Sequence, residues 1–400
     1  MTTKPELIQP FKGVLPTPDK AHLVATRSYL TYSDYELKDK LSRNPFSYLH
    51  VIHPSGSLES HAGHMAPIRN AFEEFLKKGW LVQDDQPAFY VLRQSSELGV
   101  VTGILGLVPA AAAESGVVKV HEATLSEREV LFADYLAQVG LNAEPTLLAY
   151  DPNVHLQRAM DGITAGRPEC DFTTADGVRH ALWKAAGPAL ERIQEAASEL
   201  DALYIADGHH RVASSQRLAK AHPHHPGAQH FMTLMVPGDQ LIFKGYHRLL
   251  RRVESHWDLN SCLNLIRQCP EVTCQPMGDV KRAPMAHEIH LRGSASLDLT
   301  IDLSQTDLTL PEWLQERVLA PAFGIDAPRT DRRLRYLTDD EWLKLRDQDA
   351  KQDLAFVLPP LDFDALKSVA DSGRFMPPKS TWIAPKLRSG LALYDFGPAV

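Results

Sequence analysis

Five consecutive residues near the middle of the chain have the side chains needed to bind a phosphate group and act on it. The segment Asp207-Gly208-His209-His210-Arg211 follows a short apolar run and precedes a helical pattern. Backbone amides at a helix start attract phosphate, glycine permits close approach, and arginine can bind two phosphate oxygens. Asp207 could hold Mg²⁺ or accept a proton. The pattern favours phosphoryl transfer; the alternative is a polar surface turn in which Asp207 only caps the helix.

A second group of polar residues lies just before another predicted helix. The pattern Thr124-Leu-Ser-Glu127 predicts a capping box, in which Thr124 accepts a hydrogen bond from the amide near Glu127. Glu122 could act as a general base for a hydroxyl or as a magnesium ligand. Equally, Glu122 could be an acidic residue that the helix dipole favours. Thr124 is explained by the capping box alone.

Two further segments bring positive charge. His247-Arg248 belongs to a local basic run, which could bind phosphate or could be a solvated basic face. The polar loop MPPKSTWIAPK at 376–386 contains Lys379, Ser380, Thr381 and Lys386 between prolines. Two cations and two hydroxyls on a stiffened backbone suit a loop that closes over phosphates. Without such a role the loop would be an ordinary Pro-Pro turn.

Hydrophobic spacing predicts the elements that position these residues. Helices are expected at 66–78, from Thr124 to about Val139, and at 188–200, 209–221 and 363–370. Strands are expected at 89–94, 100–108, 146–150, 178–184, 202–206, 231–236, 241–243, 354–358 and 391–394, with 231–236 and 241–243 forming a hairpin. This alternation predicts an α/β (α+β) protein. We expect an N-terminal α/β domain at 1–165, a core with the DGHHR segment at 166–255, and a mixed α/β region at 256–400.

The charge balance limits the class of partner. Lys plus Arg number 42 against 50 Asp plus Glu in 400 residues, a formal net charge of −8. An acidic surface disfavours binding to nucleic acid or to an anionic membrane, so the basic segments above stand out as a local anion pocket. Small anionic ligands therefore remain the expected partners, and a homodimer is compatible with the sequence.

Other features indicate a cytoplasmic protein. The four cysteines form no CxxC pair, which favours free thiols in a reducing compartment. The start MTTKPELIQPFKG lacks the basic and apolar regions of a signal peptide. The most apolar stretch, Leu98 to Ala113, is shorter than a bilayer span and predicts a buried pair of strands.

The motifs carry a family resemblance. IADGHHR at 205–211 resembles the phosphate-binding signature of the ParB/sulfiredoxin superfamily. Residues 8–395 are similar throughout to one bacterial family of formerly unknown function that is related to free L-serine kinases. The matching segments are IQPFKGVLP at 8–16, NPFSYLHVIHP at 44–54, PAFYVLRQ at 87–94, HEAT at 121–124, LYIADGHHR at 203–211, GYHR at 245–248 and MPPKSTWIAPKLRSGL at 376–391. DGHHR and MPPKST are the specific parts.

The resemblance implies a ParB/sulfiredoxin-like core with an additional N-terminal α/β domain. It also implies an enzyme that transfers phosphate from ATP or ADP, or from pyrophosphate, to the hydroxyl of free L-serine or a related hydroxy amino acid. The catalytic residues would be Glu122, Asp207, His209, His210 and Arg211, with Mg²⁺ held by Asp207 and Glu122. The phosphate donor would contact Gly208, His209, His210, Arg211, His247, Arg248, Lys379, Ser380, Thr381 and Lys386. The substrate would contact His121, Glu122 and Thr124.

One segment departs from the family pattern, and two rival functions stay open. After the opening segment the family typically carries Pro-Pro-Tyr-Asp, whereas this chain reads Thr26-Arg27-Ser28-Tyr29-Leu30, which could change the acceptor or leave only binding. The first rival is a nucleotide-binding regulator of ParB-like type without kinase activity; the acidic balance and the lack of a basic recognition helix count against it. The second is a sulfiredoxin-like redox enzyme, which would need a cysteine near the phosphate site, and none lies between Cys170 and Cys262.

Overall fold

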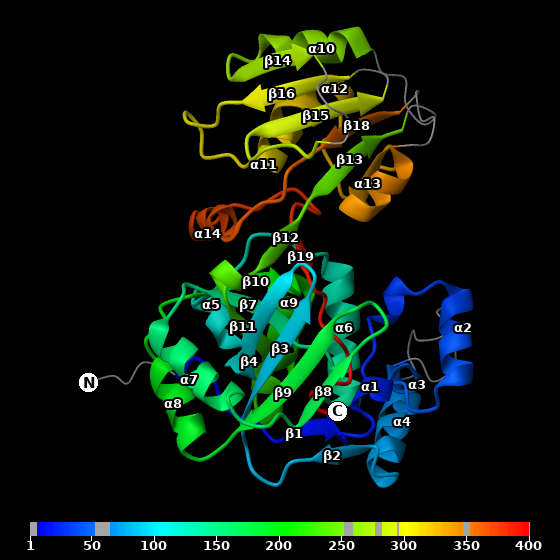
Figure 1. The fold of residues 1–400 in the computed structure, drawn as a ribbon, viewed down its shortest axis with the longest axis vertical. Coiled ribbons are helices and arrows are strands. Elements are labelled where there is room, and N and C mark those ends of the chain that lie inside the picture. Colours follow the sequence, from blue (N-terminus) through cyan, green and yellow to red (C-terminus); the bar gives the residue numbers. More distant parts are fainter. Residues whose placement is uncertain are drawn as a thin grey trace. The chain divides into compact units, whose positions relative to one another are not determined.

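The computed structural model describes residues 6–52, 65–251, 259–276, 282–293, 296–346 and 353–399 (Figure 1). The chain forms two compact units. Unit 1 comprises Met1–Val120, Thr124–Ile242 and Pro385–Val400, and unit 2 comprises His121–Ala123 and Phe243–Ala384. Both units mix helices and strands, so the predicted mixed α/β class is confirmed. The ParB/sulfiredoxin-like core and the three predicted domain ranges stay predictions.

Unit 1 is built on an eight-stranded mixed sheet. In sheet order its strands are β5 (Val118–Lys119), β10 (Leu203–Asp207), β7 (Thr146–Tyr150), β11 (His230–Pro237), β4 (Gly99–Pro109), β3 (Phe89–Ser96), β9 (Arg179–Ala185) and β8 (Cys170–Thr173). The pairs β10–β5 and β11–β7 are parallel, and the other pairs are antiparallel. Because β10 is antiparallel to β7, with Asp207 opposite Leu147, the end of β10 lies beside the start of β7.

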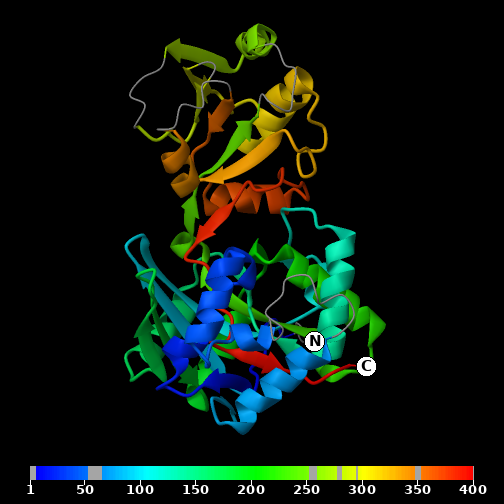
Figure 2. The ribbon, with the colours of Figure 1, turned by 90° about the vertical axis from the view of Figure 1, so that its right-hand side faces the viewer.

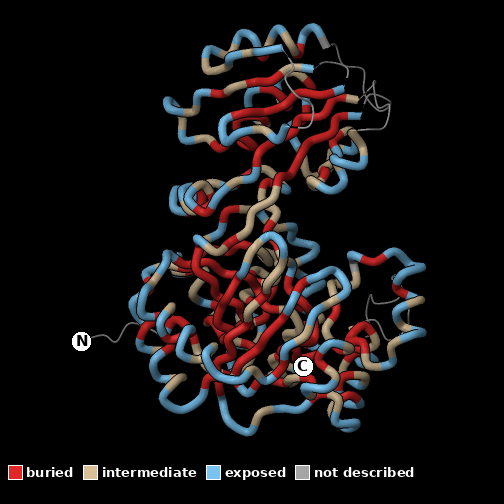
Figure 3. The backbone as a smooth tube through the Cα atoms, in the orientation of Figure 1, coloured by how far each residue is buried: buried red, intermediate tan, exposed pale blue. Residues whose placement is uncertain are grey.

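Helices cover this sheet and bury its apolar residues. On one face, Ile104, Leu148 and Ile205 pack with Leu156 of α7 (Val154–Thr164) and Ile193 of α8 (Pro188–Ala197). The strands of unit 1 are mostly buried, whereas the helices expose their outer faces (Figure 3). Another pair of helices, α6 (Ser126–Val139) and α9 (His209–Ala221), packs through the side chains of Leu136, Ala137 and Leu218. Helix α9 therefore follows β10 directly at its start and packs against α6 near its end.

A smaller sheet brings the two ends of the chain together. Its strands, in order, are β2 (Leu81–Gln83), β1 (Gly13–Pro16), β20 (Leu393–Asp395) and β6 (Leu141–Asn142). Figure 2 shows β20, in red, among the blue N-terminal elements. The helices of this region are α1 (Ala21–Val24), α2 (Asp34–Arg43), α3 (Leu49–Ile52) and α4 (Ala66–Lys77). Residues 385–392 thus cross unit 1 before the chain ends in this sheet.

Unit 2 contains a six-stranded antiparallel sheet. Its strands, in order, are β14 (Val272–Pro276), β16 (Leu297–Ile301), β15 (Glu288–Gly293), β18 (Leu354–Val357), β13 (Tyr246–Leu250) and β17 (Leu334–Thr338). Apolar residues that alternate along these strands, such as Ile289 and Leu299, pack against α10 (Leu259–Gln268), α11 (Leu310–Leu314) and α12 (Ala320–Phe323). The intervening residues of β15 are polar or charged, so the sheet's other face carries buried ionic groups. Helices α13 (Asp339–Leu345) and α14 (Phe363–Asp371) complete the unit.

Most of the predicted elements are present, and two predictions were wrong. Strands 231–236 and 241–243 do not form a hairpin: β11 pairs with β4 and β7, whereas β12 (Ile242–Lys244) pairs with β19 (Trp382–Ala384). Strand β11 pairs with β4 along one edge and with β7 along the other, so neither edge is left for β12. The apolar stretch at 98–113 is one long strand, β4, followed by the short helix α5 (Ala111–Glu114), rather than two strands. Within the described part of the chain, no helix is both long and apolar enough to cross a bilayer.

Candidate functional site

The DGHHR segment forms the predicted strand–turn–helix in unit 1. Strand β10 ends at Asp207, Gly208 adopts a left-handed conformation with φ 104°, and α9 begins at His209. The carbonyl of Gly208 accepts hydrogen bonds from the amides of Arg211 (2.9 Å) and Val212 (3.1 Å). A side chain at position 208 would come within 3.3 Å of both Arg211 and Thr146. The positive φ therefore favours glycine at this turn, and the space for a side chain is tight.

Two cations flank the carboxylate of Asp207. Its Oδ2 atom lies 3.5 Å from Lys386 Nζ and 3.8 Å from Arg211 Nη2. All three side chains are between 30% and 43% exposed, so solvent and ligands can reach them. Lys386 comes from the C-terminal segment of unit 1, far from DGHHR in sequence. The structure therefore brings Lys386, which was predicted in a separate segment, beside Asp207 and Arg211 of the DGHHR segment.

Glu144 also belongs to this cluster, although the sequence pattern did not predict it as a site residue. Arg211 Nη2 donates to Glu144 Oε1 over 2.8 Å, and Arg211 Nη1 donates to the carbonyl of Pro145. The other carboxylate oxygen, Oε2, accepts from Ser389 Oγ at 3.3 Å. Glu144 thus links the first turn of α9 to the C-terminal segment. Glu144 precedes β7, which pairs with β10, so knowledge of the strand order could have placed it near Asp207. A single acidic residue before a proline matches no catalytic or binding motif, so the sequence alone did not indicate it.

The two histidines of DGHHR occupy the first positions of α9 and are half-buried. Ser214 Oγ donates to the carbonyl of His210 at 2.6 Å, and Ser215 Oγ donates to that of Arg211 at 2.9 Å. These bonds tie the first helical turn to the second. The roles of His209 and His210 in binding phosphate stay predictions.

His121 and Glu122 lie in unit 2, together with part of the C-terminal loop. The carbonyl of His121 accepts a hydrogen bond from the amide of Met376 at 2.8 Å. The Nε2 atom of the His121 ring is 3.5 Å from Thr381 Oγ1. Arg329 Nη2 donates to Glu122 Oε1 and to the carbonyl of Ala123, both over 2.8 Å. The structure therefore groups His121, Glu122 and Thr381, and it adds Arg329 as the ion-pair partner of Glu122. The proposed roles of these residues stay predictions.

The capping box predicted at Thr124 is wrong. Helix α6 begins at Ser126, and Leu125 occupies the N-cap position without a side-chain hydrogen bond. Thr124 Oγ1 instead donates to Glu129 Oε1 at 2.5 Å. Because the helix starts one residue too late for the capping pattern, the hydroxyl of Thr124 bonds to a side chain and not to an amide. Its contact with substrate stays a prediction.

His247 and Arg248, on β13 of unit 2, are buried, so they do not form a solvated basic face. His247 Nε2 lies 3.0 Å from Asp339 Oδ1, and Nδ1 accepts from the amide of Leu358 at 3.2 Å. Burial would raise the pKa of Asp339, but the hydrogen bond with His247 outweighs it, so the pKa is lowered. In this conformation both ring nitrogens of His247 are engaged within the protein.

Arg248 contacts the C-terminal loop. Its guanidinium donates to the carbonyls of Tyr246 (2.8 Å), Lys379 (3.1 Å) and Pro378 (3.4 Å), and it lies 3.4 Å from Ser380 Oγ. The guanidinium also lies over the ring of Tyr336, with 5.0 Å between Arg248 Cζ and the ring centroid. Burial lowers the pKa of Arg248 to about 10. The structure thus joins Arg248, Lys379 and Ser380, although direct contact of Arg248 with phosphate stays a prediction.

The described residues contain no cluster of three or more histidine, cysteine or acidic side chains that could hold a metal. Magnesium commonly uses one or two carboxylates and takes its remaining ligands from substrate phosphates and water. The half-exposed Asp207 fits that use, so Mg²⁺ could bind there together with a phosphate donor. The predicted sharing of one ion by Asp207 and Glu122 joins residues of different units and stays a prediction.

The cysteines offer no reactive thiol near the DGHHR turn. All four are free, and Cys170 and Cys262 are buried. Burial raises the pKa of each of these two thiols to about 12. A reactive cysteine needs a low pKa and access to solvent, so the sulfiredoxin-like rival gains no support.

Several solved structures are similar to parts of this chain. A free serine kinase mutant in complex with ADP is 15% identical with a TM-score of 0.39, and covers 71% of this chain and 91% of its own. The C-terminally truncated SbnI from Staphylococcus aureus is 10% identical with a TM-score of 0.38, and covers 70% and 84%. A conserved hypothetical protein from Pyrococcus furiosus is 16% identical with a TM-score of 0.36, and covers 70% and 92%. TM-scores this low do not establish a shared fold.

The family is shown by a direct match of the sequence. No curated protein matches the chain. A family model described as "Protein of unknown function (DUF1015)" matches residues 8–364, which include the DGHHR turn, the His121-Glu122 pair and most of unit 2. This chain therefore belongs to the DUF1015 family.

Proposed function

We propose that this protein is a phosphotransferase that phosphorylates the hydroxyl of free L-serine, or of a related hydroxy amino acid. The donor would be ATP, ADP or pyrophosphate, and the product from serine would be O-phospho-L-serine. One observation carries the proposal: Asp207 contacts both Arg211 and Lys386 at the start of α9, beside a turn whose positive φ favours glycine. The sequence resemblance to relatives of free L-serine kinases supports the choice of acceptor.

Each residue of this cluster has a chemical task in such a reaction. The amino acid oxygen forms a bond to phosphorus while the bond from phosphorus to the donor's leaving oxygen breaks. Negative charge spreads over the phosphoryl oxygens, so the guanidinium of Arg211, the ammonium of Lys386 and the start of α9 would stabilise it. Asp207, or Glu122, would take the proton of the acceptor hydroxyl. Mg²⁺, when bound with the donor, would neutralise phosphate charge beside Asp207.

The geometry of the ion pairs suits an exchange of partners. Charge-assisted hydrogen bonds usually span about 2.7–2.9 Å. Asp207 is 3.5 Å from Lys386 and 3.8 Å from Arg211, so both contacts are weaker than direct hydrogen bonds. Exposed pairs of this kind contribute about 0–1 kcal/mol. Lys386 can therefore leave Asp207 for a phosphate oxygen at small cost, while Glu144 and the carbonyl of Pro145 hold Arg211 beside the turn.

The segment that departs from the family pattern lies next to this cluster. Thr26 and Ser389 exchange two backbone hydrogen bonds, of 3.1 and 2.9 Å, and Ser389 contacts Glu144. A change at Thr26–Leu30 could therefore alter the choice of acceptor. Discrimination between serine and threonine rests on one methyl group, worth about 1–3 kcal/mol, so we expect incomplete specificity.

A transfer assay tests the proposal. The full chain with Mg²⁺ is incubated with ATP, ADP, CTP or pyrophosphate and with L-serine, L-threonine or L-homoserine, and products are identified by mass. We expect O-phospho-L-serine with at least one donor. Tight nucleotide binding without any phosphorylated amino acid would overturn the kinase proposal and favour the ParB-like nucleotide-binding regulator.

A further inference from the structure

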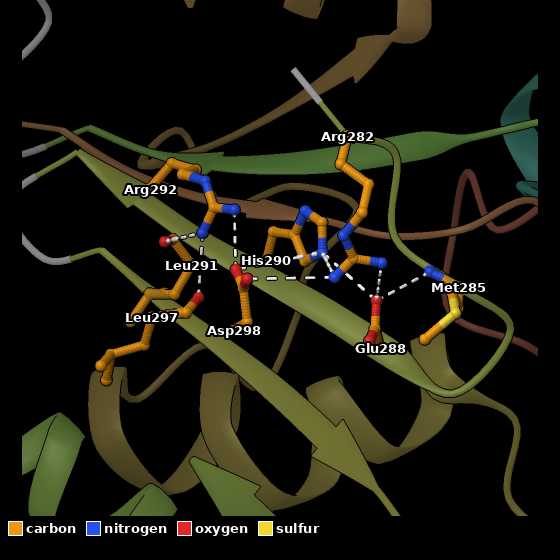
Figure 4. A network of polar contacts seen from close by, with 8 residues as sticks. All are labelled: Arg282, Met285, Glu288, His290, Leu291, Arg292, Leu297 and Asp298. Atoms are coloured by element: carbon orange, nitrogen blue, oxygen red, sulfur yellow. Dashed lines mark hydrogen bonds and ion pairs between the residues drawn. The ribbon is translucent and has the colours of Figure 1, made fainter. Parts of the chain in front are cut away.

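Arg248 differs from the other buried arginine of the same sheet. In Figure 4, Arg292 of β15 donates to Asp298 of β16 at 2.7 Å, and Arg282 donates to Glu288 at 2.7 Å, so each buried charge has an opposite charge beside it. Arg248 is at least as buried, yet all its hydrogen bonds go to neutral oxygens. Within the described part of the chain, no carboxylate lies within ion-pair distance of its guanidinium.

A buried cation without a counter-charge is costly, and proteins normally pair it or bind an anion near it. The depressed pKa of Arg248 has this origin, because burial disfavours its charged form and only the Tyr336 and Tyr246 side chains oppose that effect. Positive potential is therefore left in the loop that covers Arg248. An anionic ligand on the outer side of that loop would offset it.

The covalent geometry of the loop shows which groups would face such a ligand. The carbonyls of Pro378 and Lys379 both point at Arg248. In a planar trans peptide the N–H points opposite to the C=O. The amides of Lys379 and Ser380 therefore both point away from Arg248, on the same side of the loop.

The loop contains a left-handed residue, a feature that it shares with backbone anion sites. Lys379 is the single non-glycine residue with positive φ in the described part of the chain, at 60°. Successive amides around a left-handed residue form concavities that bind phosphate. The turn is closed by a side chain, because Ser380 Oγ donates to the carbonyl of Pro377 at 2.7 Å. Lys379 is exposed, with Nζ 5.8 Å from the centre of the Tyr246 ring, so a ligand can reach the loop.

We propose that the Pro377–Thr381 loop is a cradle for a phosphoryl oxyanion, in which the backbone amides of Lys379 and Ser380 bind the ligand and Arg248 positions them from behind. Arg248 is then a positioning residue that adds its charge through the loop. The proposal refines the predicted donor contacts of this loop, and it can stand without the kinase activity because the ligand is defined by its phosphate.

Hydrogen exchange with mass spectrometry measures the predicted donors directly. The full chain is compared in inorganic phosphate and in chloride of equal ionic strength, with ADP and L-serine as further arms. At a phosphate concentration of about ten times the dissociation constant, we expect exchange at the Lys379 and Ser380 amides to slow about tenfold. No protection by phosphate or ADP in the wild-type chain overturns the proposal, and so does protection by L-serine alone.

Variants separate the backbone role from a side-chain role. Arg248→Gln should abolish the phosphate-dependent protection, whereas the matched control Arg335→Gln, an exposed arginine on neighbouring β17, should leave it unchanged. Lys379→Gly should keep most of the protection, because glycine readily adopts positive φ. Loss in Lys379→Gly with retention in Arg248→Gln would mean that the lysine side chain binds and would overturn the proposal.

Two further results keep the test decisive. If Arg248→Gln does not fold, Ser380→Ala serves in its place, since it removes the bond that closes the turn and should weaken protection severalfold. The outcome for the kinase proposal is separate. Protection of the Lys379 and Ser380 amides without phosphate transfer to an amino acid would support the cradle and contradict the kinase. Phosphate transfer without that protection would support the kinase and contradict the cradle.

Discussion

Two polar clusters of this protein look alike in composition but differ in what they can do. In unit 1, the side chains of Asp207, Arg211 and Lys386 are between 30% and 43% exposed. Asp207 contacts the two cations at 3.5 and 3.8 Å, although Arg211 also pairs with Glu144 at 2.8 Å. In unit 2, the Figure 4 cluster of Glu288, His290, Arg292 and Asp298 is at most 10% exposed, with its shortest contact at 2.7 Å. Charge density alone therefore does not mark a ligand site. Charged groups that are accessible and loosely paired can exchange partners, whereas closed pairs stabilise the fold.

The largest expected effect is a loss of phosphoryl transfer when Asp207, in the accessible cluster of unit 1, is changed. Asp207→Asn should reduce phosphoryl transfer by about 10³-fold, equivalent to about 4 kcal/mol, because it removes a magnesium ligand or proton acceptor. The mass assay measures turnover, and thermal unfolding should show little change because Asp207 is half-exposed. Asp171→Asn, which alters a surface ion pair with Arg179 in the same unit, is the control. Full activity in Asp207→Asn would show that this carboxylate has no chemical role.

The opposite behaviour is expected in the Figure 4 cluster. Asp298→Asn leaves Arg292 buried without its 2.7 Å carboxylate partner, and breaking such a pair costs about 3 kcal/mol. Urea unfolding should show the lost stability, and the transfer rate per folded molecule should stay near wild type. If Asp298→Asn were as stable as wild type but inactive, the cluster would be a functional site and the distinction drawn above would fail.

The sequence predicted local features well and long-range ones poorly. The run from β10 through Gly208 into α9 was predictable because apolar alternation, glycine and helical spacing are all local signals. The contact of Lys386 with Asp207, and the part played by Glu144, depend on how distant segments pack, so no spacing rule predicts them. The capping box failed by one residue, and the hairpin failed because β11 found partners on both edges. The contact of Arg248 with the C-terminal loop was not predicted either, because a run of basic residues in a sequence does not show which of them is buried.

A smaller effect tests whether the link through Glu144 matters. Glu144→Gln keeps the shape of the side chain but loses its charge, so Arg211 would be held less firmly near the turn. We expect the KM for the phosphate donor to rise about tenfold, or about 1.4 kcal/mol, with kcat changed less. Glu191→Gln, at the exposed first turn of α8 in the same unit, is the control. A fall in kcat with constant KM would mean that Glu144 acts on the reacting groups.

The smallest effect depends on pH and compares two buried histidines. In unit 1, burial and the charge of Arg388 lower the pKa of His180 from 6.5 to about 4, although Asp176 opposes them. In unit 2, burial and Arg292 also lower the pKa of His290, but Asp298 and Glu288 oppose the shift more directly, at 3.9 and 3.4 Å. A folded state that resists protonation loses stability once the unfolded chain binds the proton. The free energy of unfolding should therefore fall as pH drops from about 6.5 to about 4, by at most about 1.4 kcal/mol per pH unit from His180.

His180→Phe tests this difference because it keeps a ring stacked on Phe172 and removes the titrating group. Hydrogen exchange of β3 and β9, measured between pH 4.5 and 7, should show a flatter pH dependence of local stability than in the wild-type chain, with a constant offset at neutral pH. His155→Asn, a change at an exposed histidine of unit 1, should leave the slope unchanged. An unaltered slope in His180→Phe would assign the acid sensitivity of unit 1 to its carboxylates. Burial without a close counter-charge would then have no measurable consequence at His180, and the same physical effect would be less expected at Arg248.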